Sequence, residues 1–273
     1  MTPSGAPSVD ALLEVAIAAA RAGGAVLMEG LARPAEVELK SERTSIVTWA
    51  DVTAQDKIVD IVTAAFPDHA ILGEEGLAGQ AEGPCTWLVD PLDGTSNYAH
   101  GIPFACTSVA VRDADGLAAG AIFEPFRGEL FTASRGGGAW LGGARLAVSD
   151  VSALNRAMVC TGIQADDRDA IEAYGRRIVE LNVHCRGVRG LGAPALCLAY
   201  VAAGRIEAFL ERDATYAWDV GAGGLMITEA GGRIEDLDGG ALNLGTGFAN
   251  VLATNAHIHD ELAALLRKTG DRA

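Results

Sequence analysis

The stretch of sequence that decides the fold runs Trp87-Leu88-Val89-Asp90-Pro91-Leu92-Asp93-Gly94-Thr95-Ser96-Asn97. Its apolar start predicts a buried strand that ends at Asp90. Pro91 and Gly94 permit a sharp turn, so the two aspartates can point at one small volume. Two anions packed together are unfavourable unless cations lie between them. Considered alone, the stretch predicts either a cation-binding turn or an ordinary polar turn built from aspartate and glycine.

Composition defines the class of protein around this stretch. At 273 residues, the chain can bury a sizeable core, as one large domain or two closely packed halves. Hydrophobic residues make up 49% of it and charged residues 21%, which is typical of a globular protein. The net charge of −15 argues against a protein that binds the phosphate backbone of nucleic acids, because such proteins need clustered lysine and arginine.

The sequence indicates a cytoplasmic protein. Its five cysteines show no CxxC spacing, which favours reduced thiols over a disulfide framework or a zinc site. The first ten residues have neither a positive start nor an apolar core, so no signal peptide is expected. Residues 9–31 are apolar on one face but carry four charged residues, which argues against a membrane span: Asp10, Glu14, Arg21 and Glu29.

The pattern along the chain predicts irregularly alternating helices and strands. A helix is expected over 9–30, with Ser8 as its N-cap and Gly23-Gly24 marking close packing against a neighbour. We further expect strands within 36–49 and at 70–72, 87–89, 106–112, 118–123, 130–134, 157–161 and 206–210, and helices at 51–66, 169–181, 194–203, 219–230 and 256–268. This order favours layered α+β architecture over a doubly wound parallel sheet, with an N-terminal half at 1–150 and a C-terminal half at 151–273.

Three further segments complete a pattern that covers nearly the whole chain. They are Thr48-Trp49-Ala50-Asp51, Gly73-Glu74-Glu75, and Trp218-Asp219-Val220-Gly221-Ala222-Gly223 followed by Thr228-Glu229-Ala230-Gly231-Gly232. Together with the central stretch, in this order and at these spacings, they resemble the inositol monophosphatase family. The resemblance implies a layered α/β/α/β/α sandwich of the inositol monophosphatase and fructose-1,6-bisphosphatase type, a Mg²⁺-dependent and lithium-sensitive phosphatase activity, and a homodimer.

The chemistry of phosphate release explains why oxygen ligands recur in these segments. Hydrolysis of a phosphate monoester needs a water nucleophile, a leaving alkoxide in line with it and neutralised phosphoryl oxygens, and two or three Mg²⁺ ions can supply all of these. Mg²⁺ prefers oxygen ligands. The resulting candidate ligands are Asp51, Glu74, Asp90, the carbonyl of Leu92, Asp93 and Asp219.

The resemblance also implies a role for each candidate. By this resemblance, the higher-affinity ion is held by Glu74, Asp90 and the Leu92 carbonyl. The second ion is held by Asp90, Asp93 and Asp219. Asp51 would complete an outer or third position. Thr95 and Glu74 orient and deprotonate the nucleophilic water, with Asp51 as a further member of the catalytic set. The N–H groups of Gly94 and Thr95 contact the phosphate. The expected substrate-binding residues are Asp93, Gly94, Thr95, Gly192, Pro194, Glu211 and Asp219.

Two positions near these motifs have simpler interpretations. Asn97 is expected to stabilise a turn and not to react. Lys40 lies in the early polar hairpin, where a solvated lysine is favoured over one that reaches the phosphate.

Substrate choice depends on the segment before Trp218. Inositol-directed relatives place a glutamate there, and the count from the preceding helix selects Glu211. The segment has one residue more than theirs, and a shifted register would place Arg212 in the pocket, favouring a second phosphate or a carboxylate on the substrate. The residues from Thr161 to Arg168 also depart from the family pattern.

Inositol monophosphate is therefore the first candidate substrate. Fructose 1,6-bisphosphate, histidinol phosphate, nucleotide 3′-phosphates and NADP are the alternatives within the family. A regulatory binding protein on the same fold is a different class that stays open, and degraded metal ligands would favour it. A metal-dependent nuclease is weaker, because it needs a basic track for nucleic acid.

Overall fold

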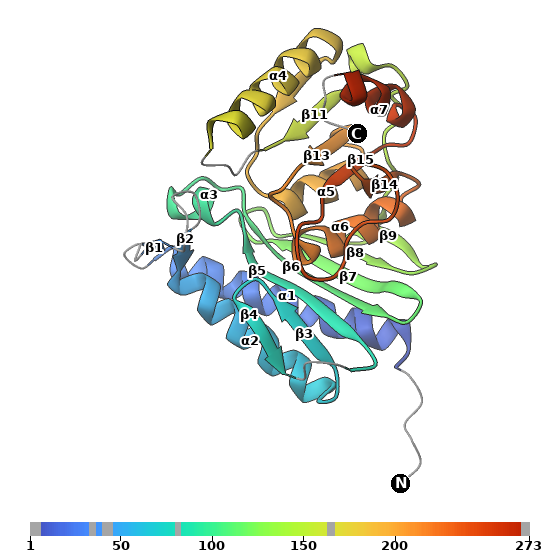
Figure 1. Cartoon of the computed structure of the whole chain (residues 1–273). Coiled ribbons are helices and arrows are strands. Elements are labelled where there is room, and N and C mark those ends of the chain that lie inside the picture. Colours follow the sequence, from blue (N-terminus) through green and yellow to red (C-terminus); the bar gives the residue numbers. More distant parts are fainter. Residues whose placement is uncertain (1–6, 33–36, 40–45, 80–82, 163–166, 269–273) are drawn as a thin grey trace.

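Helices and sheets stack in five layers, in the order helix, sheet, helix, sheet, helix (Figure 1). The computed structural model describes residues 7–32, 37–39, 46–79, 83–162 and 167–268. The layered α+β architecture expected from the sequence is the one observed.

The larger sheet is built from the N-terminal half of the chain. Its eight strands are β3 (Ala70–Gly73), β4 (Gly76–Gly79), β5 (Thr86–Asp93), β6 (Cys106–Asp113), β7 (Gly116–Glu124), β8 (Glu129–Ser134), β9 (Gly138–Leu141) and β10 (Ala144–Arg145). They lie in the order β10-β9-β8-β7-β6-β5-β3-β4, and β3 with β5 is the parallel pair among antiparallel neighbours. A hairpin of β1 (Val37–Leu39) and β2 (Ile46–Thr48) stands apart from this sheet.

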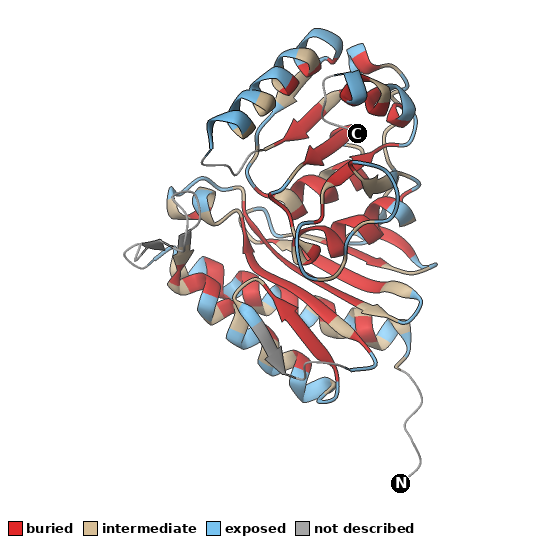
Figure 2. Cartoon of the chain, in the orientation of Figure 1, coloured by how far each residue is buried: buried red, intermediate tan, exposed pale blue. Residues whose placement is uncertain are grey.

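Helices α1 (Val9–Gly30) and α2 (Trp49–Ala65) cover the outer face of the larger sheet (Figures 1 and 2). The Ser8 hydroxyl caps α1 by accepting a hydrogen bond of 3.2 Å from the N–H of Ala11, as the sequence predicts. The apolar faces of both helices bury the sheet residues Trp87, Val89 and Val109. This burial fixes the outer face of β5, the strand that carries the central aspartates.

Gly23 lets α1 approach the sheet closely, which confirms the packing expected at Gly23-Gly24. A Cβ added at Gly23 would lie 2.7 Å from Cγ2 of Thr107 and 3.1 Å from Cδ1 of Ile58. The Thr107 hydroxyl donates a hydrogen bond of 2.9 Å to the carbonyl of Pro91, so this side chain is held in place. Thr107 therefore packs against α1 and also holds the backbone of the central stretch at Pro91.

We expect Gly23→Ala to lower the free energy of unfolding by about 1–2 kcal/mol, because overpacking outweighs the better helix propensity of alanine. Gly175, which lies within a helix of the C-terminal half, is the matched control, since a Cβ there meets no atom of the described residues within 4 Å. Gly175→Ala should raise stability by about 0.5–1 kcal/mol. Urea unfolding of both variants measures the two changes, and equal effects would contradict the close approach of α1.

The smaller sheet is built from the C-terminal half. Its strands are β11 (Met158–Thr161), β12 (Gly187–Arg189), β13 (Ala208–Glu211), β14 (Arg233–Asp236) and β15 (Val251–Thr254), in the order β12-β11-β13-β15-β14. Strands β12, β11 and β13 run parallel, and β15 is antiparallel to its neighbours. The helices of this half are α4 (Arg168–His184), α5 (Pro194–Ala202), α6 (Ala217–Glu229) and α7 (His259–Lys268).

Helices α5 and α6 form the middle layer between the two sheets (Figure 1). One buried cluster joins Leu88 and Ile122 of the larger sheet to Ala222 of α6 and to Phe209 and Ala253 of the smaller sheet. The proposed boundary near residue 150 falls between β10 and β11. Because both halves contribute to one core, the division into residues 1–150 and 151–273 stays a prediction.

The strand before the central aspartates is longer than the sequence predicts. β5 does not end at Asp90 but continues to Asp93. Asp90 pairs with Ser108, and Asp93 pairs with Cys106. Between these two pairs β5 has one residue more than β6, so the register shifts there. The extra residue makes a bulge, which accommodates Pro91 and re-aims side chains without ending the strand.

Among the described helices, α1 alone has the length and apolar composition needed to cross a membrane. Its buried face packs on the larger sheet, and core helices of globular proteins pass the same test.

Candidate active site

The bulge in β5 brings Asp90 and Asp93 to the same side of the strand end. Both side chains are buried, with 2% and 3% of the residue surface exposed. Oδ1 of Asp90 accepts a hydrogen bond of 3.0 Å from the N–H of Leu92, and Oδ2 of Asp93 accepts one of 3.2 Å from the N–H of Leu196 at the start of α5. Backbone donors from two layers therefore fix the two carboxyl groups.

Asp219 joins this pair from the first turn of α6. Its Oδ2 accepts a hydrogen bond of 2.6 Å from the N–H of Tyr216, so the residue acts as part of the helix cap. Ligand atoms of Asp90, Asp93 and Asp219 lie within 4.8 Å of one another, and the carboxyl groups of Asp90 and Asp219 are hydrogen-bonded. We call these three residues the carboxylate cluster.

Burial and mutual repulsion favour the protonated form of the carboxylate cluster. Burial raises the pKa of Asp93 to about 7, with a further contribution from the charge of Glu74. The pKa of Asp90 and of Asp219 is raised well above the usual range, first by burial and then by the neighbouring acidic groups. A cation bound here would replace these protons and remove the repulsion.

A second group of acidic side chains lies at the start of α2 and after β3. Ligand atoms of Asp51, Glu74 and Glu75 lie within 4.8 Å of one another. Oδ2 of Asp51 accepts hydrogen bonds from the N–H (2.7 Å) and the hydroxyl (2.6 Å) of Thr48. Burial raises the pKa of Asp51 to about 6 in spite of these donors. Charge repulsion links the two groups, because Glu74 raises the pKa of both Asp51 and Asp93.

Thr95 lies between the two acidic groups. Its hydroxyl is 3.0 Å from the carbonyl oxygen of Leu92 and 3.2 Å from Oδ1 of Asp51. A hydroxyl has one proton to donate and oxygen lone pairs that accept. With its proton directed to Asp51 or Leu92, the Thr95 oxygen keeps a lone pair that can accept a hydrogen bond from a nearby water.

The turn between β5 and α3 (Thr95–Ala99) depends on Gly94. This residue has a φ of +88°, which glycine adopts without strain, and it is the N-cap of α3. A Cβ here would lie 3.0 Å from the carbonyl oxygen of Phe104 and 3.1 Å from Cβ of Ala193. The first N–H groups of a helix have no partner within the helix, so they can bind an anion.

Asn97 stabilises this turn, as the sequence predicts. Its Nδ2 donates hydrogen bonds to the carbonyl of Phe104 (2.9 Å) and to that of Leu191 (2.7 Å). Gly192, which follows, has a φ of +73°, and a Cβ on it would lie 3.2 Å from Nδ2 of Asn97. Pro194 then begins α5. The expected substrate-binding residues Gly192 and Pro194 are therefore brought next to the turn of the central stretch.

The donor chemistry of the two acidic groups fits Mg²⁺. Carboxylates and backbone carbonyls are hard oxygen ligands, and both are present at Asp51, Glu74, Asp90, Leu92, Asp93 and Asp219. Burial is the main cause of the raised pKa of Asp51 and of Asp93, and the charge of Glu74 adds to it, so a bound cation would lower both pKa values. The side chain of Glu75 was not among the predicted ligands. Glu75 follows Glu74 directly in the segment Gly73-Glu74-Glu75, and this position was the feature of the sequence that could have identified it.

The structure separates the two candidates for the substrate pocket. Glu211 ends β13 with only 5% of its surface exposed, and burial raises its pKa to about 8. Arg212 instead turns to the surface, where its guanidinium forms an ion pair with Asp238 at 3.0 Å. Lys40 and residues 163–166 of the divergent segment lie outside the described residues.

Comparison with known proteins adds a family match and close relatives. Residues 8–271 match the model of the inositol monophosphatase family. An inositol-1-monophosphatase of Synechocystis is 36% identical over 94% of this chain and 89% of its own length. A Nus factor SuhB of Pseudomonas aeruginosa is 39% identical over 84% of this chain and 86% of its own length.

Solved structures show the same architecture. The extragenic suppressor protein suhB of Bartonella henselae superposes with a TM-score of 0.87 at 35% identity, over 94% of this chain and 99% of that one. An inositol monophosphatase of Thermotoga maritima gives a TM-score of 0.85 at 33% identity, over 95% and 98% of the two chains. The fold class expected from the sequence is thereby confirmed.

Proposed function

Because the chain belongs to the inositol monophosphatase family, we propose that it is a Mg²⁺-dependent hydrolase that releases phosphate from a small phosphorylated polyol or sugar, with inositol monophosphate as the first candidate. Relatives named inositol monophosphatases match most of its length and support its class as a phosphoric monoester hydrolase. The substrate, the ion and the roles of individual residues are the proposed part.

The observation that carries the proposal is the convergence of buried carboxylates from segments far apart in the sequence. Asp90 and Asp93 come from β5 and Asp219 from α6, yet their ligand atoms lie within 4.8 Å. Folding brings these anions together at an electrostatic cost, so the arrangement is explained by a function that requires cations. Two or three Mg²⁺ ions held by the six predicted ligands would neutralise phosphoryl oxygens and lower the pKa of a bound water.

The protein's own groups then orient the nucleophile. The Thr95 hydroxyl donates a hydrogen bond to Asp51, so when a water gives a proton to the Thr95 oxygen, the proton of the Thr95 hydroxyl passes to Asp51. Glu74 lies beside Asp51 and takes part in the same step. The N–H groups of Gly94 and Thr95, at the start of α3, bind the phosphate while the leaving group extends toward Gly192, Pro194 and Glu211.

Glu211 is the proposed selector of the hydroxyl-bearing part of the substrate. Oε2 of Glu211 is buried without a hydrogen-bond partner among the described residues, so it can accept a hydrogen bond from a ring hydroxyl. Arg212 does not support the alternative of a second phosphate, because it is paired with Asp238. This contrast favours neutral polyol monophosphates over fructose 1,6-bisphosphate or other acidic substrates.

At pH 9, where most of Glu211 is ionised because its pKa is about 8, we expect Glu211→Ala to raise KM for inositol 1-phosphate by roughly tenfold to a hundredfold, the effect of losing a hydrogen bond to a charged group. Arg212→Ala, at the adjacent position, is the matched control and should leave KM and kcat unchanged on inositol 1-phosphate and on fructose 1,6-bisphosphate. Steady-state kinetics of both variants on both substrates measure this. A larger effect from Arg212→Ala on the bisphosphate would reverse the assignment.

The function itself is tested by a phosphate-release screen. The purified protein is incubated with Mg²⁺ and a panel that includes inositol 1-phosphate, fructose 1,6-bisphosphate, histidinol phosphate, a nucleotide 3′-phosphate and NADP. The expected result is Mg²⁺-dependent release that is fastest with a polyol or sugar monophosphate. Absence of release from every compound, with the protein folded and Mg²⁺ bound, would rule out the proposed hydrolase.

A regulatory binding role is the second candidate, and relatives named Nus factor SuhB support it. The hydrolase is preferred because every predicted acidic ligand is present and the cluster is assembled. We further propose a homodimer, a cytoplasmic location and inhibition by Li⁺ at the second ion position. Sedimentation at micromolar concentration tests the dimer, and inhibition assays with Li⁺ at several Mg²⁺ concentrations test the competition.

A further inference from the structure

Two side chains on the inner face of β6 lie beside the carboxylate cluster. Cys106 and Ser108 are two positions apart on this strand, so they point to the same face of the larger sheet, while Thr107 between them faces α1. Both are fully buried, with 0% of the residue surface exposed. Cys106 pairs with Asp93 in the ladder between β5 and β6. Ser108 pairs with Asp90 on the other side of the register shift, so β6 is the strand against which the bulge forms.

The Cys106 thiol holds the carboxyl group of Asp93. Its Sγ lies 3.4 Å from Oδ2 of Asp93, and the thiol donates a hydrogen bond to this oxygen. The same oxygen accepts the hydrogen bond of 3.2 Å from the N–H of Leu196. A cysteine thiol is protonated near neutral pH, so it can donate, although sulfur makes a weak donor. One donor from the larger sheet and one from α5 therefore fix Oδ2 of Asp93.

The Ser108 hydroxyl holds the start of α6 against the same strand. It donates a hydrogen bond of 3.3 Å to the carbonyl of Trp218, the residue before Asp219. The thiol thus restrains a carboxyl group that comes from β5, and the hydroxyl restrains the helix that supplies the carboxyl group of Asp219. Through these two contacts, β6 links the two parts of the carboxylate cluster.

The carboxylate cluster needs such restraint because its members repel one another once they lose their protons. Their ligand atoms lie within 4.8 Å of one another, a distance at which ionised carboxylates in a buried site move apart unless neighbours hold them. Mg²⁺ demands near-ideal octahedral geometry. Ligands that have drifted apart must be brought back before they can bind this ion, which lowers its affinity.

We propose that Cys106 and Ser108 are positioning residues that hold the carboxylates of β5 and α6 at the separation that a shared divalent cation requires. The inference rests on the proposed function, since it assumes that the carboxylate cluster binds Mg²⁺. Neither residue supplies a charge to the cluster. Replacement of either one leaves the acidic ligands in place and loosens their arrangement. Outer partners of metal ligands typically contribute 10- to 100-fold to metal affinity or activity.

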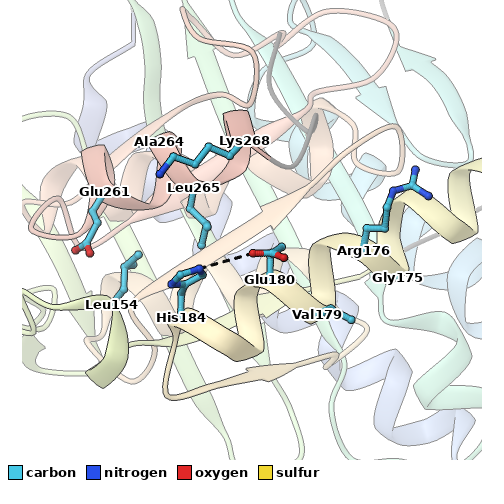
Figure 3. Close-up of a pocket in the computed structure, with 10 residues that line it drawn as sticks. All are labelled: Leu154, Gly175, Arg176, Val179, Glu180, His184, Glu261, Ala264, Leu265 and Lys268. Carbon is cyan, nitrogen blue, oxygen red and sulfur yellow. Dashed lines mark ion pairs between the residues drawn. The ribbon is translucent and has the colours of Figure 1, made fainter.

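Acidic side chains elsewhere provide a control for unspecific binding of cations. A groove of about 810 Å³ between α4 and α7 is lined by Glu180, His184 and Glu261, among others (Figure 3). Glu180 forms an ion pair of 3.7 Å with His184, and Glu261 is exposed in the first turn of α7. All residues that line this groove lie between Leu154 and Lys268, so β6 does not contribute to it. Cations that bind at such exposed acidic groups should not respond to changes in β6.

The test measures Mg²⁺ binding by calorimetric titration of the full-length protein after dialysis against a chelator. Cys106→Ala and Ser108→Ala should each weaken Mg²⁺ binding about tenfold, the lower end of the usual range, because the thiol is a weak donor and the Ser108 hydrogen bond is long. Cys85→Ala is the matched control, since it removes a buried thiol from the outer face of the larger sheet. This variant and Glu261→Gln should both keep the wild-type affinity.

A conservative variant and the wild type separate the possible failures. Cys106→Ser keeps a donor and should bind Mg²⁺ more tightly than Cys106→Ala, so equal affinities would overturn the role of the thiol hydrogen bond. If Cys106→Ala or Ser108→Ala keeps the wild-type affinity, the residue that it replaces has no positioning role. If the wild type itself binds no Mg²⁺, the proposed function fails together with the inference. Urea unfolding shows that each variant is folded under the conditions of the titration.

Discussion

Asp93→Asn is expected to reduce kcat/KM by more than about 100-fold, since even the outer-shell partners of metal ligands typically contribute 10- to 100-fold. The substitution removes one charge at nearly constant volume. An asparagine Oδ1 can still accept the hydrogen bond that the N–H of Leu196 gives to Asp93, so the start of α5 stays in place. The loss should therefore appear in Mg²⁺ affinity and turnover, which Mg²⁺ titrations of the initial rate measure, and not in the fold.

A matched control is available on α2. Asp56 is exposed, and Asp56→Asn makes the same chemical change away from the acidic groups. This variant should keep wild-type turnover and Mg²⁺ dependence. If Asp93→Asn also kept wild-type turnover at saturating Mg²⁺, Asp93 would not be a metal ligand.

Local signals predicted much of the fold. The Ser8 cap, the close-packed Gly23 and the strand before Asp90 are each encoded within a few residues, and each is observed. Helix ends differ by a few residues: α2 begins at Trp49 and not at residue 51, because Thr48 is the N-cap. The short strands β4, β9, β10, β12, β14 and β15 were not predicted, since strands of two to four residues give too little alternation to detect.

The site was predicted in composition but not in geometry. The motif around Asp90 and Asp93 identified two of the acidic side chains that lie together, yet the bulge that orients them depends on pairing with β6, which is a long-range contact. The position of the Arg212 side chain likewise depends on Asp238, which lies 26 residues further along the chain and forms an ion pair with the arginine.

Removal of metal should make stability fall as pH rises. The pKa values of Asp51 and Asp93 in the folded protein are about 6 and about 7, above the value of about 4 for an aspartate in an unfolded chain. The folded state therefore binds more protons than the unfolded state between about pH 4 and pH 7. By linkage, the stability that these protons provide is fully present below pH 4 and is lost as pH rises through the folded pKa values.

The melting temperature of the metal-free protein should accordingly be lower at pH 8 than at pH 5.5. Saturating Mg²⁺ at pH 8 should raise it by about 5 °C, since a ligand at a hundred times its Kd adds about 2.7 kcal/mol and 1 kcal/mol corresponds to roughly 2 °C or more in a chain of this size. Calorimetry after dialysis against a chelator, with and without Mg²⁺, measures both effects. Asp93→Asn should melt higher than the wild type without metal and gain less from Mg²⁺, because it removes both the repulsion and a ligand. A metal-free melting temperature that is flat or rises from pH 5.5 to 8 would show that the buried carboxylates are not held in repulsion, and the physical reason for a cation at this site would be lost.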